Sequence, residues 1–97
     1  MKNKYLSKLK NLTLALLKDE EIKIILFGSR ARGDNNLTSD VDIGLLPYGR
    51  IDRKKITLLK EKIEGMNIPY KVEVVDLSET SEEFRKEAMK GAMLWKD

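Results

Sequence analysis

Two short motifs in this chain combine residue types that could handle phosphate groups and a divalent metal ion. The first is Gly-Ser-Arg-Ala-Arg-Gly at residues 28–33, and the second is Ser-Asp-Val-Asp at residues 39–42. A glycine that ends a strand lets the backbone approach a bound anion, and the first N–H groups of a following helix favour phosphate. Two aspartates one residue apart on a strand project from the same face and could hold a metal beside those phosphates. Together the motifs indicate nucleotide chemistry.

The first motif differs from the two best-known phosphate-binding loops. Gly28 would let the backbone approach the anion, Ser29 would offer a hydroxyl group, and Arg30 and Arg32 would add positive charge. A P-loop needs Lys after its second glycine, where this chain has Asp, and a dinucleotide fingerprint needs Gly where this chain has Arg30. Neither loop is therefore present, and a plain glycine turn with solvated arginines remains an alternative.

The second motif supplies a pair of carboxylates that needs a partner. Asp40 and Asp42 would repel one another on one face of a strand unless they are solvated or neutralised by a cation. A third carboxylate could come from Glu73 or Asp76, which have opposite parity, so at most one of them shares a face with the aspartates. The alternative is a solvent-facing edge strand with surface carboxylates.

Composition narrows the chemistry further. The 97 residues include no Cys and no His, which excludes disulfides, Cys/His zinc sites, thiol nucleophiles and histidine acid–base catalysis. Any metal must therefore have oxygen ligands, which favours Mg²⁺, with Mn²⁺ as the other candidate. The net charge of +3 does not by itself indicate nucleic-acid binding. Because no apolar run approaches the roughly 20 residues that span a bilayer, we expect a soluble cytoplasmic protein without membrane contact. The length suits a single domain over residues 1–97.

The pattern of apolar residues predicts the elements that position these motifs. Helical spacing indicates a helix over residues 3–18, and a β-branched run predicts a strand over residues 22–27. A short helix over 29–33, a strand over 40–46, a helix capped by Asp52 and a strand over 70–77 follow. Thr80 and Glu83 suggest a capping box for a last helix that continues to Trp95. The order α-β-α-β-α-β-α predicts a small α/β fold whose sheet is mixed and mainly three-stranded.

The two motifs together resemble the minimal nucleotidyltransferase family of the DNA polymerase β-like superfamily. That family has Gly-Ser-x-Ala-x-Gly followed by Asp-x-Asp on the next strand, and the resemblance runs from about residue 22 to the C-terminus. It implies that Gly28 and Ser29 hold a nucleoside triphosphate and that Asp40 and Asp42 ligate Mg²⁺. Glu73 matches the position of the family's third carboxylate, which is usually Asp, and would complete the catalytic and metal site.

The resemblance also implies a substrate and a partner. Family members of this size commonly act as antitoxins beside a small helical HEPN toxin. They transfer AMP from ATP to a tyrosine of that toxin. We therefore expect a Mg²⁺-dependent adenylyltransferase that uses ATP and modifies a HEPN-type protein.

Three other functions remain open from the sequence. A catalytically degenerate member could neutralise or scaffold its partner by binding alone, and the Glu at position 73 gives this alternative some support. A small-molecule transferase would need a further domain to enclose its substrate. Direct nucleic-acid binding would rest on Arg53, Lys54 and Lys55 at the start of a helix, where a solvated face is the simpler interpretation.

Overall fold

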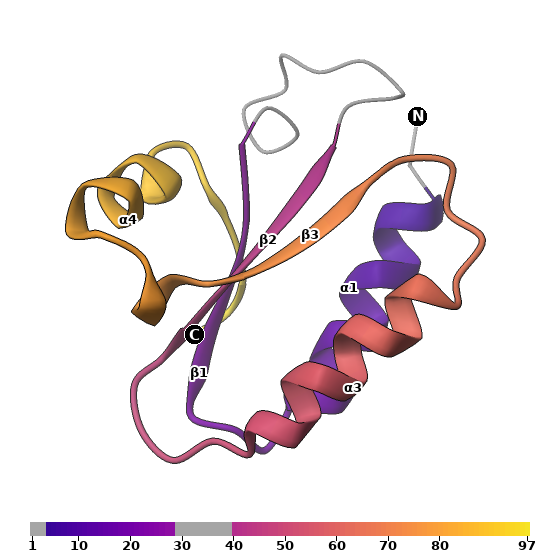
Figure 1. The fold of residues 1–97 in the computed structure, drawn as a ribbon, viewed down its shortest axis with the longest axis horizontal. Helices are drawn as coiled ribbons and strands as arrows, with labels where there is room; N and C mark the ends of the chain where they lie inside the picture. The colour runs from indigo at the N-terminus through magenta and orange to yellow at the C-terminus, as the bar shows by residue number, and fades with distance from the viewer. Residues whose placement is uncertain (1–3, 29–39) are drawn as a thin grey trace.

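The computed structural model describes residues 4–28 and 40–97, so the short helix predicted over residues 29–33 lies outside the described residues (Figure 1). The described elements, in chain order, are α1 (Lys4–Leu17), β1 (Ile22–Phe27), β2 (Val41–Pro47), α3 (Arg53–Glu64), β3 (Val72–Asp76), the 3₁₀ helix η1 (Leu77–Glu79), α4 (Glu82–Met89) and β4 (Met93–Lys96). Within these ranges no helix has both the length and the apolar character needed to cross a membrane.

The strands form one mixed sheet in the order β3-β2-β1-β4. β1 pairs antiparallel with both β2 and β4, whereas β2 and β3 are parallel and are connected through α3. A parallel connection of this kind needs a crossover, which α3 provides. The predicted α/β fold class with a mixed sheet is therefore confirmed.

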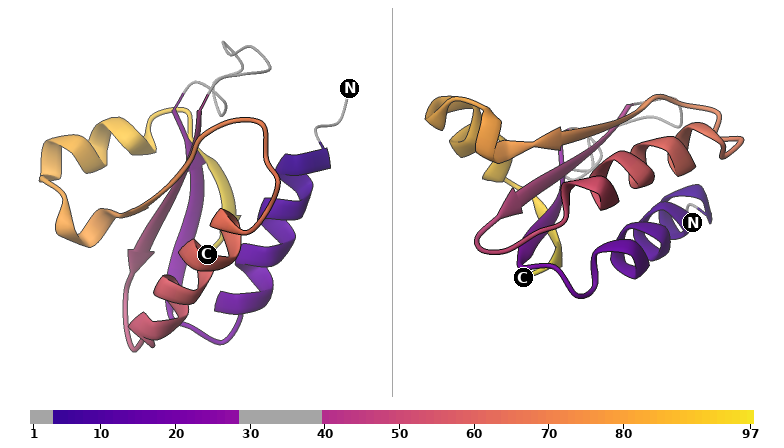
Figure 2. Two further views of the ribbon diagram at one scale, coloured as in Figure 1. Left: turned by 45° about the vertical axis from the view of Figure 1, so that its right-hand side comes forward. Right: turned by 60° about the horizontal axis from the view of Figure 1, so that its bottom comes forward.

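Helices α1 and α3 lie side by side on one face of the sheet and enclose the larger core (Figure 2). The sheet contributes alternate residues of its two central strands, and the helices contribute their apolar stripes. These buried side chains are Leu9, Leu17, Ile22, Ile24, Leu26, Val41, Ile43, Leu45, Ile56, Leu59 and Ile63. The intervening residues of β1 and β2 must therefore point to the opposite face.

The opposite face of the sheet carries a smaller apolar cluster formed with η1 and α4. Ile25, Phe27, Leu77 and Ala88 are buried there. Gly44 makes this packing possible, because a Cβ atom at that position would lie 2.9 Å from side-chain carbons of both Ile25 and Leu77.

The end of the chain differs from the prediction. α4 begins after Ser81, whose hydroxyl accepts a hydrogen bond from the backbone N–H of Phe84, so Ser81 rather than Thr80 is the N-cap. The helix ends at Met89, and Gly91, with φ of 69°, reverses the chain. Residues 93–96 then form a fourth strand beside β1 instead of continuing the helix to Trp95, so the three-stranded count was wrong. The physical reason is that β1 has a second edge, whose backbone groups need hydrogen-bond partners.

Candidate functional site

The site is built around Asp42, which lies directly beside the turn that follows β1. Phe27, the last residue of β1, pairs with Asp42 in the antiparallel register. Gly28 comes next with φ of +83°, a conformation that glycine adopts readily and other residues rarely adopt. A Cβ atom at Gly28 would lie 2.6 Å from Asp42 Oδ2. The first motif and the second motif are therefore close together, as predicted, at Gly28, the first residue of the first motif.

Glu73 lies opposite Asp42 on the neighbouring strand. The parallel register of β2 and β3 pairs these two residues, and their neighbours Ile43 and Val74 pack into the core formed with α1 and α3. Because side chains alternate along a strand, Asp42 and Glu73 both project from the other face. Asp40 has the same parity as Asp42, immediately before β2, and is exposed. The three predicted carboxylates therefore share one face of the sheet.

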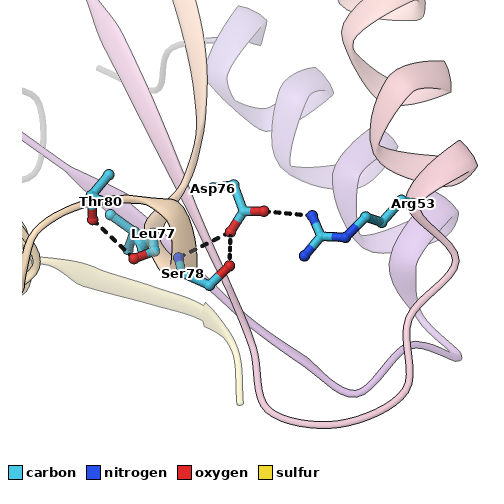
Figure 3. Close-up of polar contacts among 5 residues, drawn as sticks. All are labelled: Arg53, Asp76, Leu77, Ser78 and Thr80. Atoms are coloured by element: carbon cyan, nitrogen blue, oxygen red, sulfur yellow. Dashed lines mark hydrogen bonds and ion pairs between the residues drawn. The ribbon is translucent and has the colours of Figure 1, made fainter.

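Asp76, the other candidate for the third carboxylate, has a structural role instead (Figure 3). Its Oδ1 atom accepts a hydrogen bond of 3.0 Å from the Ser78 backbone N–H and thereby caps η1. Its Oδ2 atom accepts a hydrogen bond of 2.7 Å from Arg53 Nη1 on α3. Partial burial would raise the pKa of Asp76, but the hydrogen bonds from Ser78 and Arg53 outweigh it and lower the pKa. The strand register therefore brings Glu73, and not Asp76, to the face that carries Asp42, a choice that side-chain parity alone left open.

The electrostatics of the site indicate a shortage of positive charge. Partial burial raises the pKa of Asp42, and the negative charges of Glu73 and Asp40 raise it further, while Lys71 opposes the shift. Like charges gathered at one place disfavour ionisation of each member. A cation bound beside Asp42 would relieve this repulsion.

The side chains present fit a hard divalent cation. All the available donors are carboxylate oxygens, and Mg²⁺ is usually held by one or two carboxylates together with substrate phosphates and water. In the described part of the chain, no three acidic side chains lie close enough together to hold a metal ion. Glu73 lies instead near Lys71, with 3.9 Å between Glu73 Oε1 and Lys71 Nζ. The arrangement fits a metal held first by Asp40 and Asp42, with a nucleotide supplying further oxygens.

The rest of the predicted phosphate motif falls outside the structure. Ser29, Arg30 and Arg32 lie among residues 29–39, outside the described residues, so their roles stay predictions. Lys71, by contrast, is a site residue that sequence analysis missed. The signal was its position two residues before Glu73, which places both side chains on one face of a strand.

Comparison with known proteins places the chain in a family. The family described as "Polymerase beta, Nucleotidyltransferase" matches residues 8–97. A curated relative from Haemophilus influenzae, named "Probable protein adenylyltransferase MntA", is 33% identical over 60 residues. The match covers 62% of this chain and 53% of the relative, so the chain spans about half the length of that relative.

Solved structures share the fold. A crystal structure of a toxin–antitoxin with AMP-PNP is 26% identical, with a TM-score of 0.66, over 90% of this chain and 72% of that one. The MNT antitoxin structure solved with a tri-AMPylated Shewanella oneidensis HEPN toxin is similar in fold, at 22% identity and a TM-score of 0.61, over 93% of this chain and 71% of the other. Because the family match extends over nearly the whole chain, the chain belongs to the polymerase beta nucleotidyltransferase family.

Proposed function

We propose that this chain is a Mg²⁺-dependent adenylyltransferase that transfers AMP from ATP to a tyrosine hydroxyl of a HEPN-type toxin and so acts as its antitoxin. The observation that carries the proposal is the position of Asp42, which lies against Gly28 and opposite Glu73 on one sheet face. Further support comes from the relative named a probable protein adenylyltransferase and from the similar toxin–antitoxin structure with AMP-PNP. The tyrosine acceptor and the HEPN partner rest on the resemblance to minimal nucleotidyltransferases.

Each site residue has a defined task in this proposal. Gly28 and Ser29 would hold the triphosphate through backbone N–H groups and a hydroxyl, with Arg30 and Arg32 beside them. Asp40 and Asp42 would hold Mg²⁺. When bound, the metal ion supplies charge neutralisation at the α-phosphate and at the departing pyrophosphate.

Glu73 would help to hold metal and would act as the general base. The tyrosine oxygen forms a bond to the α-phosphorus, the bond from that phosphorus to pyrophosphate breaks, and the hydroxyl proton passes to the Glu73 carboxylate. Glu73 is exposed on an edge strand, so an acceptor side chain can approach it from solvent.

The acceptor is expected to come from a separate protein. α1 and α3 cover one face of the sheet, and on the other face α4 packs over β1 and η1 while Asp40 and Glu73 stay exposed. Carboxylates that are exposed in this way suit an acceptor carried on a partner's surface. Because the proposed reaction uses ATP, we propose that it takes place in the cytoplasm.

A labelling experiment tests the proposal. The chain is incubated with Mg²⁺, ATP labelled at the α-phosphate and the HEPN-type protein encoded beside it, and label on that protein is measured. We expect transfer by the wild type and none by Asp42→Asn. Asp19→Asn is the matched control, since it removes the same charge from an exposed residue in the turn after α1.

Two outcomes would contradict the proposal. Label transfer that persists in Asp42→Asn would remove Asp42 from the chemistry. Full neutralisation of the toxin by Asp42→Asn without any label transfer would show an antitoxin that acts by binding alone.

A further inference from the structure

Four charged residues lie near one another on one face of the sheet where β2 and β3 begin. Val41 pairs with Val72, so the preceding residues Asp40 and Lys71 are neighbours, just as Asp42 and Glu73 are. A 2.9 Å hydrogen bond from the Val41 N–H to the Lys71 carbonyl fixes this register at its first rung. The group therefore holds three carboxylates and one ammonium group on one face of the sheet.

Lys71 forms an ion pair with Glu73, the candidate for the third metal ligand. Its Nζ atom lies 3.9 Å from Glu73 Oε1, and both side chains are more than half exposed, at 66% and 57%. An ion pair with this length and exposure is weak, so a divalent cation arriving from solvent can replace it. The positive charge of Lys71 also lowers the pKa of Asp42, against the effects of burial and of the two neighbouring carboxylates.

We propose that Lys71 is a resident counter-ion that holds Glu73 in the metal-free protein, and that a divalent cation must displace it to gain Glu73 as a ligand. Lys71 is then a positioning residue, which acts on the metal through Glu73. This inference rests on the proposed function only in requiring a divalent cation at the site.

The length of Glu73 is consistent with two alternative positions. Glutamate has one more rotatable bond than aspartate, so its carboxylate can turn toward Lys71 or toward Asp42 from the same backbone position. In the metal-free protein, Glu73 is turned toward Lys71. This position accounts for the finding that, among the described residues, no three carboxylates lie close enough together to hold a metal ion. Glu73 is thus paired with Lys71, whose positive charge can substitute for that of the metal ion.

Direct binding of Mn²⁺ tests the inference without nucleotide or partner. Free Mn²⁺ is measured by electron paramagnetic resonance during titration of the full chain. For Lys71→Met we expect the Kd to fall by about three- to tenfold, because a competing cation next to the site is removed. Lys71→Arg restores the charge and should stay within about twofold of the wild type.

Lys86→Met is the matched control. Lys86 forms a similar exposed ion pair on α4, with Nζ 3.7 Å from Glu82 Oε1, and its loss changes the net charge by the same amount. Its Kd for Mn²⁺ should equal that of the wild type. The effect of Lys71→Met should also disappear in a Glu73→Gln background, since the double-mutant cycle isolates the contribution made through Glu73.

The outcomes separate this inference from the proposed function. Unchanged Mn²⁺ affinity in Lys71→Met, or an equal gain in the Glu73→Gln background, overturns the role of Lys71 while leaving AMP transfer intact. Mn²⁺ binding that is absent, or that does not weaken in Asp42→Asn, overturns the metal site, and both proposals fail with it.

Discussion

The Asp42 carboxylate occupies the space that a side chain on Gly28 would need, since a Cβ atom there would come within 2.6 Å of Asp42 Oδ2. Gly28 also has φ of +83°, so two independent constraints require glycine at this position. The end of β1 and the second motif on β2 are thereby joined at a contact where an added Cβ atom would force the Asp42 carboxylate to move.

Gly28→Ala is expected to displace Asp42 and to abolish nucleotidyl transfer. The positive φ alone should destabilise the fold by about 1–2 kcal/mol, because an L side chain is disfavoured in that region. Transfer of label from ATP and urea unfolding measure the two effects.

Gly91→Ala is the control for this variant. Gly91 has a similar φ of 69° but lies between α4 and β4, away from the carboxylates. The control should lose comparable stability and keep its activity per folded molecule. Equal activity in both variants would contradict the argument that Gly28 positions Asp42.

The raised pKa of Asp42 makes a prediction about stability as well as activity. A folded-state pKa above the unfolded value means that the protonated form is favoured in the fold, so the stabilisation exists at low pH and is lost as pH rises through the folded-state pKa. Without metal, Asp42→Asn should therefore be more stable than the wild type at pH 7, and the difference should shrink as pH falls through the raised folded-state pKa and be lost below 3.8, the ordinary pKa. Urea unfolding in EDTA across this range measures it.

A contrary result for Asp42→Asn would be informative. Lower stability at pH 7 would mean that Asp42 is stabilised as a carboxylate, as Asp76 is, and would argue against a site that lacks positive charge. Activity should follow the opposite course, falling as pH decreases through the raised pKa, because a protonated carboxyl group is a poor metal ligand.

Most of the fold could be predicted from periodicity, because the buried faces of α1, β1, β2 and α3 repeat at 3.6 or two residues. The last segment could not. Ala88, Ala92 and Trp95 keep a helical spacing, yet Gly91 turns the chain and Trp95 packs against the main core from β4. A free edge on β1 is a property of the whole sheet, and no local pattern in residues 93–96 reports it.

Only part of the site could be predicted, because the rest also depends on contacts between residues far apart in the sequence. Parity showed only that at most one of Glu73 and Asp76 could share a face with the two aspartates, and the choice between them needed the register of β3 against β2. The partner of Asp76, Arg53, lies 23 residues away in the sequence on α3, so the ion pair that removes Asp76 from the site is a tertiary feature. Lys71 shows the same limit, since its significance depends on which strand lies beside it.

Asp76→Ala is expected to destabilise the protein without removing site chemistry. It deletes the cap of η1 and the acceptor for Arg53, and a lost cap typically costs about 0.5–2 kcal/mol. Because the folded-state pKa of Asp76 is lowered, its contribution is present above pH 3.8 and lost as pH falls through the folded-state value. Unfolding curves at several pH values test this, and Mn²⁺ affinity equal to that of the wild type would separate Asp76 from the metal site.

Glu73→Asp and Glu73→Gln together test whether the longer carboxylate completes the site. We expect Glu73→Asp to keep or raise turnover, because the shorter side chain keeps the charge and matches the residue usual in related nucleotidyltransferases. Glu73→Gln should lower turnover by about 100-fold or more, since it removes the general base and a metal ligand but keeps the size of the side chain. Steady-state label transfer measures both variants, with unfolding curves to confirm that each is folded. Turnover equal to the wild type in Glu73→Gln would show that Glu73 has no part in the reaction and that Asp40 and Asp42 act without a third carboxylate.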